Sequence, residues 1–170
     1  HSDAELAALL EARGARRAGD AELVPFLDAL AGGDAERGRK VFREKGETTC
    51  LRCHQVDKGD GGEVGPALAG IGGRLGRLGI LEAIVLPNRR VSPGYQNTVW
   101  ERENGTFVEG LLVSREHGVL RLRNAQNEIV ELDESGVVSN RTTLSAMPEG
   151  LGKQLSLREL RDLVEYLATR

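Results

Sequence analysis

The stretch Cys50-Leu51-Arg52-Cys53-His54 places two thiols three residues apart and a histidine directly after the second thiol. On a helix, residues at this spacing lie about one turn apart and point the same way. Two such thiols can each add across one vinyl group of a haem, and the adjacent imidazole can then bind the iron. The sequence therefore predicts one covalently attached haem c, anchored by Cys50 and Cys53, with His54 as an axial ligand.

Other sites that use two cysteines fit the chain less well. A structural zinc site needs four ligands, but the sequence holds two cysteines, and neither His1 nor His117 lies at zinc-finger spacing. A thioredoxin-like Cys-x-x-Cys motif is typical of a βαβ unit and needs no histidine. Because both cysteines belong to the haem motif, we expect no disulfide.

The second axial ligand is expected to be Met147, the only methionine of the chain. A thioether is a soft, neutral ligand that favours ferrous iron. A lone methionine is more often core filling. Met147, however, lies in a polar stretch with Pro148 and Gly150 directly before the last predicted helix. Such a stretch suits a ligand better than a core residue.

Four further residues are candidates for binding or orienting the cofactor. The carbonyl of Pro66, twelve residues after His54, can accept a hydrogen bond from the other ring nitrogen; otherwise it belongs to a rigid turn. Arg74 either pairs with a haem propionate or lies on the surface. Tyr95 and Trp100 combine a donor with a large apolar body, so they either close the haem edge or form sheet core.

Composition and charge narrow the class of protein. The 170 residues are 39% hydrophobic, which allows either one sizeable core or a small domain plus an appendage. The net charge of −3 offers no basic surplus for a nucleic-acid partner. Covalent haem attachment predicts a periplasmic, or otherwise extracytoplasmic, bacterial location. The start lacks a signal peptide and no apolar stretch is long enough to be a transmembrane segment, so we expect a processed chain or a fragment of a longer one.

Hydrophobic periodicity predicts five helices, over residues 3–13, 20–30, 34–45, 79–86 and 156–169. Asp34 is the expected N-cap of the third helix, and Ser156 with Glu159 forms a capping box for the last one. Residues 1–31 are predicted to be an N-terminal helical extension, which is either a helical-repeat remnant or linker, or a packing extension that covers one side of the domain. Residues 34–170 are predicted to be the domain that carries the haem.

Between about residues 96 and 140 the period switches to two, which is typical of strands. Asn104-Gly105 is a strong hairpin signal, and His117-Gly118 and the stretch from Asn124 to Asn127 are further turn candidates. We therefore predict four or five antiparallel strands in a small meander. The expected fold class is a mainly α domain with this inserted β-meander and the N-terminal helical extension.

Residues 50–74, with their Cys-x-x-Cys-His motif, Gly-Pro pair and Gly-Ile-Gly-Gly-Arg stretch, resemble the haem segment of class I cytochromes c. Residues 94–124 and 144–167 more closely resemble the planctomycete/verrucomicrobial-type haem-binding domain, which commonly ends large secreted proteins. The resemblance covers about residues 34–170. It implies a c-type cytochrome domain with a cytochrome-c-like fold, in which crossing first and last helices meet at Gly38, Phe42 and Tyr166. One departure is Gln126-Asn127, where an Asp-Gly turn is expected, and it leaves the strand register of that hairpin open.

Two functions follow as hypotheses. The first is a non-enzymatic one-electron carrier with a six-coordinate, His/Met-ligated iron, which passes electrons from a dehydrogenase to a cytochrome or oxidase. The second is a haem-based peroxidase, or a gas or redox sensor, in which Met147 leaves the iron. A peroxidase also needs a distal acid–base group, and neither His1 nor His117 has a spacing that supplies one. The β segment is either a lid over the haem or a docking surface for a partner.

Overall fold

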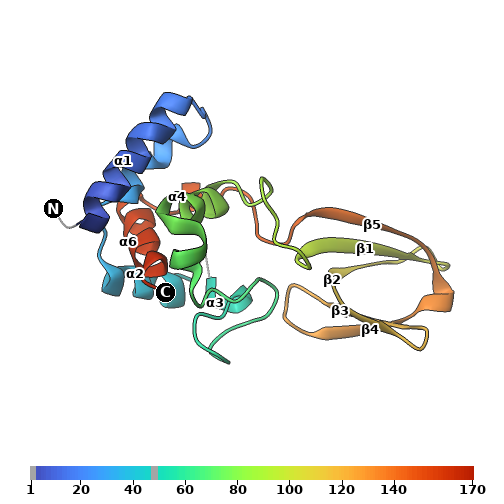
Figure 1. Ribbon diagram of the computed structural model, residues 1–170. Helices are drawn as coiled ribbons and strands as arrows, with labels where there is room; N and C mark the ends of the chain where they lie inside the picture. The colour runs from blue at the N-terminus through green and yellow to red at the C-terminus, as the bar shows by residue number, and fades with distance from the viewer. Residues whose placement is uncertain (1–2, 47–49) are drawn as a thin grey trace. The chain divides into compact units, whose positions relative to one another are not determined.

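The computed structural model describes residues 3–46 and 50–170, and it shows two compact units. The helical unit comprises His1–Leu51, Leu68–Arg90 and Pro148–Arg170, and the sheet unit comprises Arg52–Ala67 and Val91–Met147. Figure 1 shows the elements of each unit in chain order. The chain passes from the first unit to the second within the short helix α3, Cys50–Cys53.

The remaining helices all belong to the helical unit apart from one short turn. They are α1 (Asp3–Ala18), the 3-10 helix η1 (Val24–Leu30), α2 (Ala35–Glu44), α4 (Ile71–Val85), α5 (Leu151–Gln154) and α6 (Leu157–Ala168). Within this unit, α6 contacts α2, α4 and η1. Its apolar residues supply much of the buried core of the unit.

Helices α2 and α6 cross at a glycine. Gly38 is buried, and a Cβ at this position would lie 2.5 Å from the carbonyl carbon of Asp162 and 2.7 Å from the Cβ of Tyr166. One turn further along α2, Phe42 packs against Tyr166 with the two ring centroids 5.8 Å apart. The predicted meeting of Gly38, Phe42 and Tyr166 is therefore confirmed.

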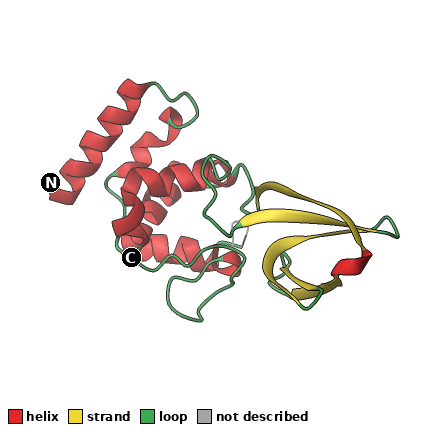
Figure 2. Ribbon diagram, turned by 45° about the vertical axis from the view of Figure 1, so that its right-hand side comes forward, coloured by secondary structure: helices red, strands yellow, loops and turns green. Residues whose placement is uncertain are grey.

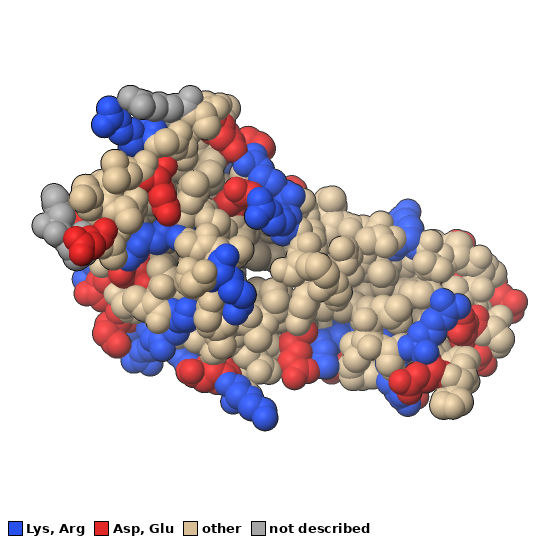
Figure 3. Space-filling model, in the orientation of Figure 1, with Lys and Arg blue, Asp and Glu red and all other residues tan. Residues whose placement is uncertain are grey.

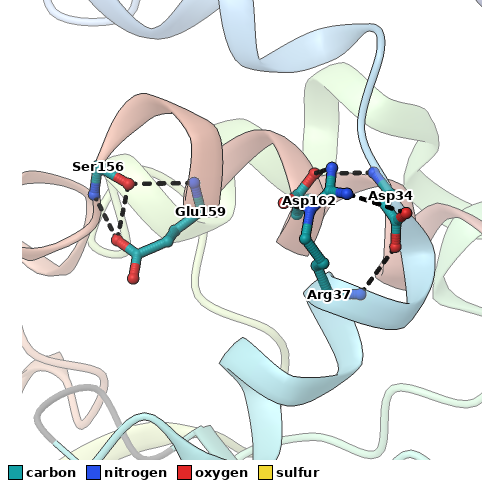
Figure 4. A network of polar contacts seen from close by, with 5 residues as sticks. All are labelled: Asp34, Arg37, Ser156, Glu159 and Asp162. Carbon is teal, nitrogen blue, oxygen red and sulfur yellow. Dashed lines mark hydrogen bonds and ion pairs between the residues drawn. The ribbon is translucent and has the colours of Figure 1, made fainter.

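A buried carboxylate joins the same two helices. Asp162, whose side chain is 4% exposed, accepts hydrogen bonds from Nε and Nη2 of Arg37 at 2.7 and 3.0 Å and from the backbone N–H of Asp34 at 2.8 Å (Figure 4). Burial alone would raise the pKa of Asp162, but these donors together hold it below its ordinary value. The carboxylate is therefore charged at neutral pH.

The two predicted helix caps are confirmed. The side chain of Asp34 accepts from the backbone N–H of Arg37 at 2.9 Å. At the start of α6, the backbone N–H of Ser156 donates to Glu159 at 2.8 Å, and the N–H of Glu159 donates to Oγ of Ser156 at 3.3 Å (Figure 4). Lys45 also pairs with Glu159 at 2.6 Å. The ammonium group and the cap together lower the pKa of Glu159 to about 2.

Three helices differ from their sequence prediction in length or type. Helix α1 continues to Ala18, and the second predicted helix is a 3-10 helix that begins only at Val24, with a proline in its first turn. Helix α4 begins at Ile71 and is interrupted at Gly76, whose φ is 63°. The glycines at the start of α4 have low helix propensity, so the sequence pattern conceals this turn. Packing requires at least one of them, because a Cβ at Gly72 would lie 2.6 Å from the carbonyl carbon of Ala168.

The sheet unit contains five antiparallel strands (Figure 2). They are β1 (Gln96–Arg102), β2 (Phe107–Glu116), β3 (Val119–Arg123), β4 (Ile129–Asp133) and β5 (Val137–Ser145), with the 3-10 turn η2 (Glu134–Gly136) before β5. Their order across the sheet is β4-β3-β2-β1-β5. The first four strands follow one another as neighbours, whereas β5 returns to pair with β1, where Val99 lies opposite Arg141.

The three predicted hairpin turns are confirmed. Gly105, between β1 and β2, has a φ of 77°, and His117 and Gly118, between β2 and β3, have φ values of 52° and 77°. Between β3 and β4, Asn127 takes the positive φ of 66° that the turn requires. Asparagine tolerates this conformation better than most residues. The register that the sequence left open pairs Arg123 with Ile129.

The core of the sheet unit is small and is organised around one tryptophan. Trp100 is 5% exposed, and its indole N–H donates to Oγ1 of Thr98 at 2.8 Å. The buried cluster comprises Trp100, Leu120, Leu122 and Leu132, with Val108 and Val137 packed against it. Since these side chains come from β1 to β4 and from the start of β5, the cluster links all five strands.

The expected fold class, a mainly α domain with a small inserted β-meander and an N-terminal helical extension, is wrong. Of the residues that the structure describes, 43% are in helices and 22% in strands, and the five strands form one sheet in a compact unit together with Arg52–Ala67. The order of the strands also differs from a meander. Residues 139–142 of β5 are polar and exposed, so they lack apolar alternation, and bonds to β1 make them a strand. The predicted division into residues 1–31 and 34–170 stays a prediction.

Surface charge and the apolar character of the helices are the two properties that bear on nucleic-acid and membrane partners. Figure 3 shows Lys and Arg interspersed with Asp and Glu on the face drawn. Among residues 3–46 and 50–170, no helix combines the length and the apolar character that crossing a membrane requires.

Candidate functional site

Helix α3 carries both thiols of the Cys-x-x-Cys-His motif. Cys50 begins the helix, Cys53 ends it, and both are half-buried. Burial raises the pKa of the Cys53 thiol, and the charge of Arg52 opposes this only in part. The thiol is therefore protonated at neutral pH. A protonated thiol supplies both the sulfur and the hydrogen that addition across a vinyl group consumes.

A backbone carbonyl holds the imidazole of His54. Nδ1 of His54 lies 2.8 Å from the carbonyl oxygen of Pro66. Because a carbonyl can only accept, Nδ1 donates its proton and Nε2 keeps a lone pair. Burial lowers the pKa of His54 by more than the Pro66 carbonyl raises it. The ring is therefore neutral at neutral pH, with a bare Nε2, which is the form that binds a metal.

Residues 62–66, here named the histidine loop, bring Gly65 and Pro66 against this imidazole. The N–H of Gly65 donates to the carbonyl of Cys53 at 2.7 Å. A Cβ at Gly65 would lie 2.7 Å from Nδ1 and 2.8 Å from Nε2 of His54. Only glycine permits the backbone to come this near to the ring, and that approach brings the carbonyl of Pro66 to Nδ1.

A cavity of about 360 Å³ lies beside the histidine loop within the sheet unit. Gly65 and Tyr95 line it together with Leu111 and Leu112 of β2, and Arg123 of β3 adds a charged group. Tyr95 is half-buried. The structure therefore brings Tyr95 to the loop that holds the imidazole, and the cavity that they share has one apolar wall.

Met147 lies two residues beyond the end of β5. It is half-buried, and its backbone N–H donates to Oγ of Ser145 at 3.1 Å. Leu144, in the same stretch, has a side chain that is 64% exposed. Met147 belongs to the sheet unit, as do Cys53 and His54. Its role as the second axial ligand stays a prediction.

Trp100 and Arg74 lie in different surroundings from the residues near His54. Trp100 is in the core of the sheet, with its indole N–H already donated to Thr98. Arg74 is exposed in α4 of the helical unit, and its guanidinium group donates to the carbonyl of Ala69. Each position corresponds to the second of the two roles considered for that residue, sheet core for Trp100 and surface for Arg74. Contact of either side chain with a haem stays a prediction.

Sequence reasoning missed Glu63 of the histidine loop and the two residues that contact it, Arg123 and Asn127. The carboxylate of Glu63 pairs with Nη2 of Arg123 at 2.6 Å, and the backbone N–H of Glu63 donates to Oδ1 of Asn127 at 3.0 Å. These partners are far apart along the chain, so no local spacing connects them. The one available signal was Gln126-Asn127, which departs from the expected turn dipeptide.

The donor set suits a covalently attached haem. Cys50 and Cys53 are a helical turn apart, and the next residue is a neutral imidazole whose Nε2 keeps the lone pair that an iron would take. The remaining ring nitrogen has an acceptor at a hydrogen-bonding distance of 2.8 Å, as metal-binding histidines usually do.

Comparison with known proteins finds similarity to cytochromes c over part of the chain. Cytochrome c of Gibberella zeae is 44% identical over 45 residues, which is 26% of this chain and 39% of that protein. Cytochrome c of Gossypium barbadense is 48% identical over 42 residues, 25% of this chain and 34% of that protein. Cytochrome c of Chlamydomonas reinhardtii is 44% identical over 50 residues, 29% and 40% of the two chains.

These matches are partial in both directions. The chain spans between 34% and 40% of the length of these curated relatives. No family model matches the chain. Several partial matches at this level of identity support a cytochrome c domain within this chain.

Proposed function

We propose that this chain is an electron-transfer domain of the cytochrome c type, with one haem c attached through Cys50 and Cys53 and bound at the iron by His54. The observation that carries the proposal is the pairing of the His54 imidazole with the Pro66 carbonyl directly after two thiols on one helical turn. The similarity to cytochromes c supports the same function and the same cofactor.

Each of these residues has a defined task. Cys50 and Cys53 form thioethers with the two vinyl groups, so the cofactor stays in place through many oxidation cycles. His54 presents its unprotonated Nε2 to the metal, because Nδ1 gives its hydrogen to Pro66. That hydrogen bond fixes the tautomer and the orientation of the ring, and it raises the basicity of the ligand.

We further propose Met147 as the second axial ligand and Tyr95 as a residue at the haem edge. A thioether on the sixth position leaves no open site for a substrate, which suits a carrier rather than an enzyme. Haem bound in this way supplies reversible one-electron oxidation and reduction. The half-buried Tyr95 beside the histidine loop would keep water from the edge of the cofactor.

The proposed setting is extracytoplasmic, and the proposed partners are redox proteins. Covalent haem attachment, and the resemblance to domains of secreted proteins, support a bacterial periplasmic location. A dehydrogenase would donate the electron, and a cytochrome or an oxidase would accept it. The planctomycete/verrucomicrobial-type family is the closer assignment that we propose within the cytochromes c.

The test is optical and uses the matured chain. We expect the ferrous protein to show the sharp α-band of low-spin, six-coordinate haem and to bind carbon monoxide only slowly. Met147→Ala should open the iron and bind carbon monoxide rapidly. Leu144→Ala, a change in the same stretch at an exposed side chain, should behave like the unmodified chain. Rapid binding by the unmodified chain would instead indicate an open iron and the peroxidase or sensor function.

A further inference from the structure

The β3–β4 hairpin holds the histidine loop at two points. One is the ion pair between Glu63 and Arg123, and the other is the hydrogen bond from the Glu63 N–H to Oδ1 of Asn127. Arg123 also donates to the same Oδ1 from Nη1 at 3.2 Å, so the three residues form one network. We name Glu63, Arg123 and Asn127 the hairpin clamp.

The position of the network makes it more than a surface contact. The Arg123 side chain is 17% exposed and that of Glu63 is 58% exposed, and both residues line the cavity next to Gly65 and Tyr95. Glu63 is three residues before Pro66, whose carbonyl accepts from His54. A shift of the histidine loop at Glu63 would therefore move the acceptor of the imidazole hydrogen bond.

We propose that the hairpin clamp is a positioning device that sets the reduction potential of the haem by fixing the Pro66 carbonyl on Nδ1 of His54. The proposal rests on the proposed haem function and assigns to the sheet a share in the control of the iron. Glu63, Arg123 and Asn127 are positioning residues, since they act through the loop.

The direction of the effect follows from the hydrogen bond. An acceptor on Nδ1–H makes the imidazole a stronger donor to the metal and so favours ferric iron. A loosened histidine loop weakens that bond for part of the time. The reduction potential should therefore rise when the hairpin clamp is removed, and the Nδ1 proton should exchange faster with solvent.

Asn127→Gly is the sharpest variant, because glycine takes the positive φ of 66° without strain and removes only the side chain. Its matched control is His117→Gly, at the opposite end of β3, where the native residue also has a positive φ of 52°. Asn127→Asp keeps an oxygen for the Glu63 N–H and is the conservative rescue. Glu63→Gln removes the ion pair with little change of volume.

The variant that tests the ion pair and its control lie on the same strand, β3. Arg123→Ala removes the guanidinium group that holds Glu63. Arg121→Ala removes a neighbouring cross-strand pair, in which Nε of Arg121 lies 2.8 Å from Glu131 of β4. Both changes delete an arginine from β3, but only the first deletes a bond to the histidine loop.

The measurements are the reduction potential by redox titration and the solvent exchange of the His54 Nδ1 proton by NMR of the ferrous protein. We expect Asn127→Gly, Arg123→Ala and Glu63→Gln to raise the reduction potential. Each should also speed solvent exchange of the Nδ1 proton about fivefold, which is the size of effect expected when one partly exposed polar contact is lost. His117→Gly and Arg121→Ala should leave both values unchanged, and Asn127→Asp should retain most of the native exchange rate.

Two results would overturn the role of the hairpin clamp. One is an unchanged potential and exchange rate in the clamp variants, even if their thermal stability falls, since the network would then be structural only. The other is an equal change in the control variants. Failure of the underlying function is distinguishable, because the unmodified chain would then lack covalently attached, low-spin haem before any variant is made.

Discussion

The helical unit and the sheet unit are stabilised in different ways. In the helical unit, α2 and α6 approach closely at Gly38, and the buried carboxylate of Asp162 joins them through Arg37. In the sheet unit, five strands share a small apolar cluster around Trp100, and positive-φ turn residues such as Asn127 determine the hairpins. One unit depends on close backbone contact and a paired charge, and the other on a single large side chain.

This difference matters because His54, the proposed iron ligand, belongs to the unit that buries fewer apolar side chains. His54 and the histidine loop lie in the sheet unit, and their bonds run to β3 and to the turn after it. The sheet is therefore part of the surroundings of the candidate iron ligand rather than an accessory to a complete helical domain. Substitutions in each unit should show separately how the helical unit and the sheet unit are stabilised.

Trp100→Ala should have the largest effect. It removes the largest side chain of the sheet core and should cost about 4 kcal/mol. We expect hydrogen exchange to rise throughout β1–β5, while α2 and α6 keep their protection. Trp100→Phe, which fills most of the space and loses the hydrogen bond to Thr98, should cost less. Equal loss of protection against hydrogen exchange in both units would show that the two units are not stabilised separately.

Gly38→Ala should be the most damaging small change in the helical unit. The added Cβ would meet backbone of Asp162 and force α2 and α6 apart, at a cost of about 3 kcal/mol. The matched control is Gly14→Ala in α1, where a Cβ would meet no described atom within 4 Å. That change should stabilise the helix by about 0.5 kcal/mol. Thermal unfolding that ranks the two variants alike would argue against a close crossing.

Arg37→Ala should destabilise the protein less than Gly38→Ala, because the buried Asp162 carboxylate loses its guanidinium partner but keeps the backbone N–H of Asp34. The partial exposure of Arg37 reduces the penalty from that of a fully buried pair. Since the folded pKa of Asp162 lies below its ordinary value, this stabilisation is complete above the ordinary pKa and disappears as the pH falls through the folded one. Arg39→Ala, which removes an exposed pair with Glu36 on the same helix, is the control. Urea titrations at neutral and acid pH that show equal losses for both variants would exclude the special role of Asp162.

Glu159→Gln should have the smallest effect. Glutamine can still serve the capping box, but it loses the ion pair with Lys45, so the cost is about 0.5 kcal/mol at neutral pH. The pKa of Glu159 is lowered from its ordinary 4.5 to about 2. The difference in stability between the unmodified chain and Glu159→Gln should therefore be complete above pH 4.5 and vanish as the pH falls through about 2. A difference that does not change with pH would mean that the charge contributes nothing.

The helical unit could be predicted in large part because its signals are local. Asp34 and the Ser156–Glu159 box mark helix starts within four residues. The contact of Gly38 with Tyr166 was expected from the resemblance to cytochromes c. The start of α4 was missed, because glycines carry no apolar periodicity and their place is set by contact with α6.

The sheet could be predicted only in part. Turn residues identified the hairpins, but β5 is a strand because of its distant partner β1, which no local pattern reveals. The same holds for the candidate site. The motif from Cys50 to His54 is local, and the spacing of Pro66 pointed to His54, whereas the bonds of Glu63 with Arg123 and Asn127 depend on how the sheet folds back onto the loop.

The most direct test of the proposed function is the attachment of haem to the matured chain. The chain should be produced in a bacterial periplasm with a cytochrome c maturation system, and the pigment should then be extracted with acidified acetone. We expect the colour to stay with the polypeptide, and a variant with both Cys50 and Cys53 replaced by alanine to lose it. A colourless chain, or pigment that passes into the acetone, would contradict the covalent haem on which the proposed function depends.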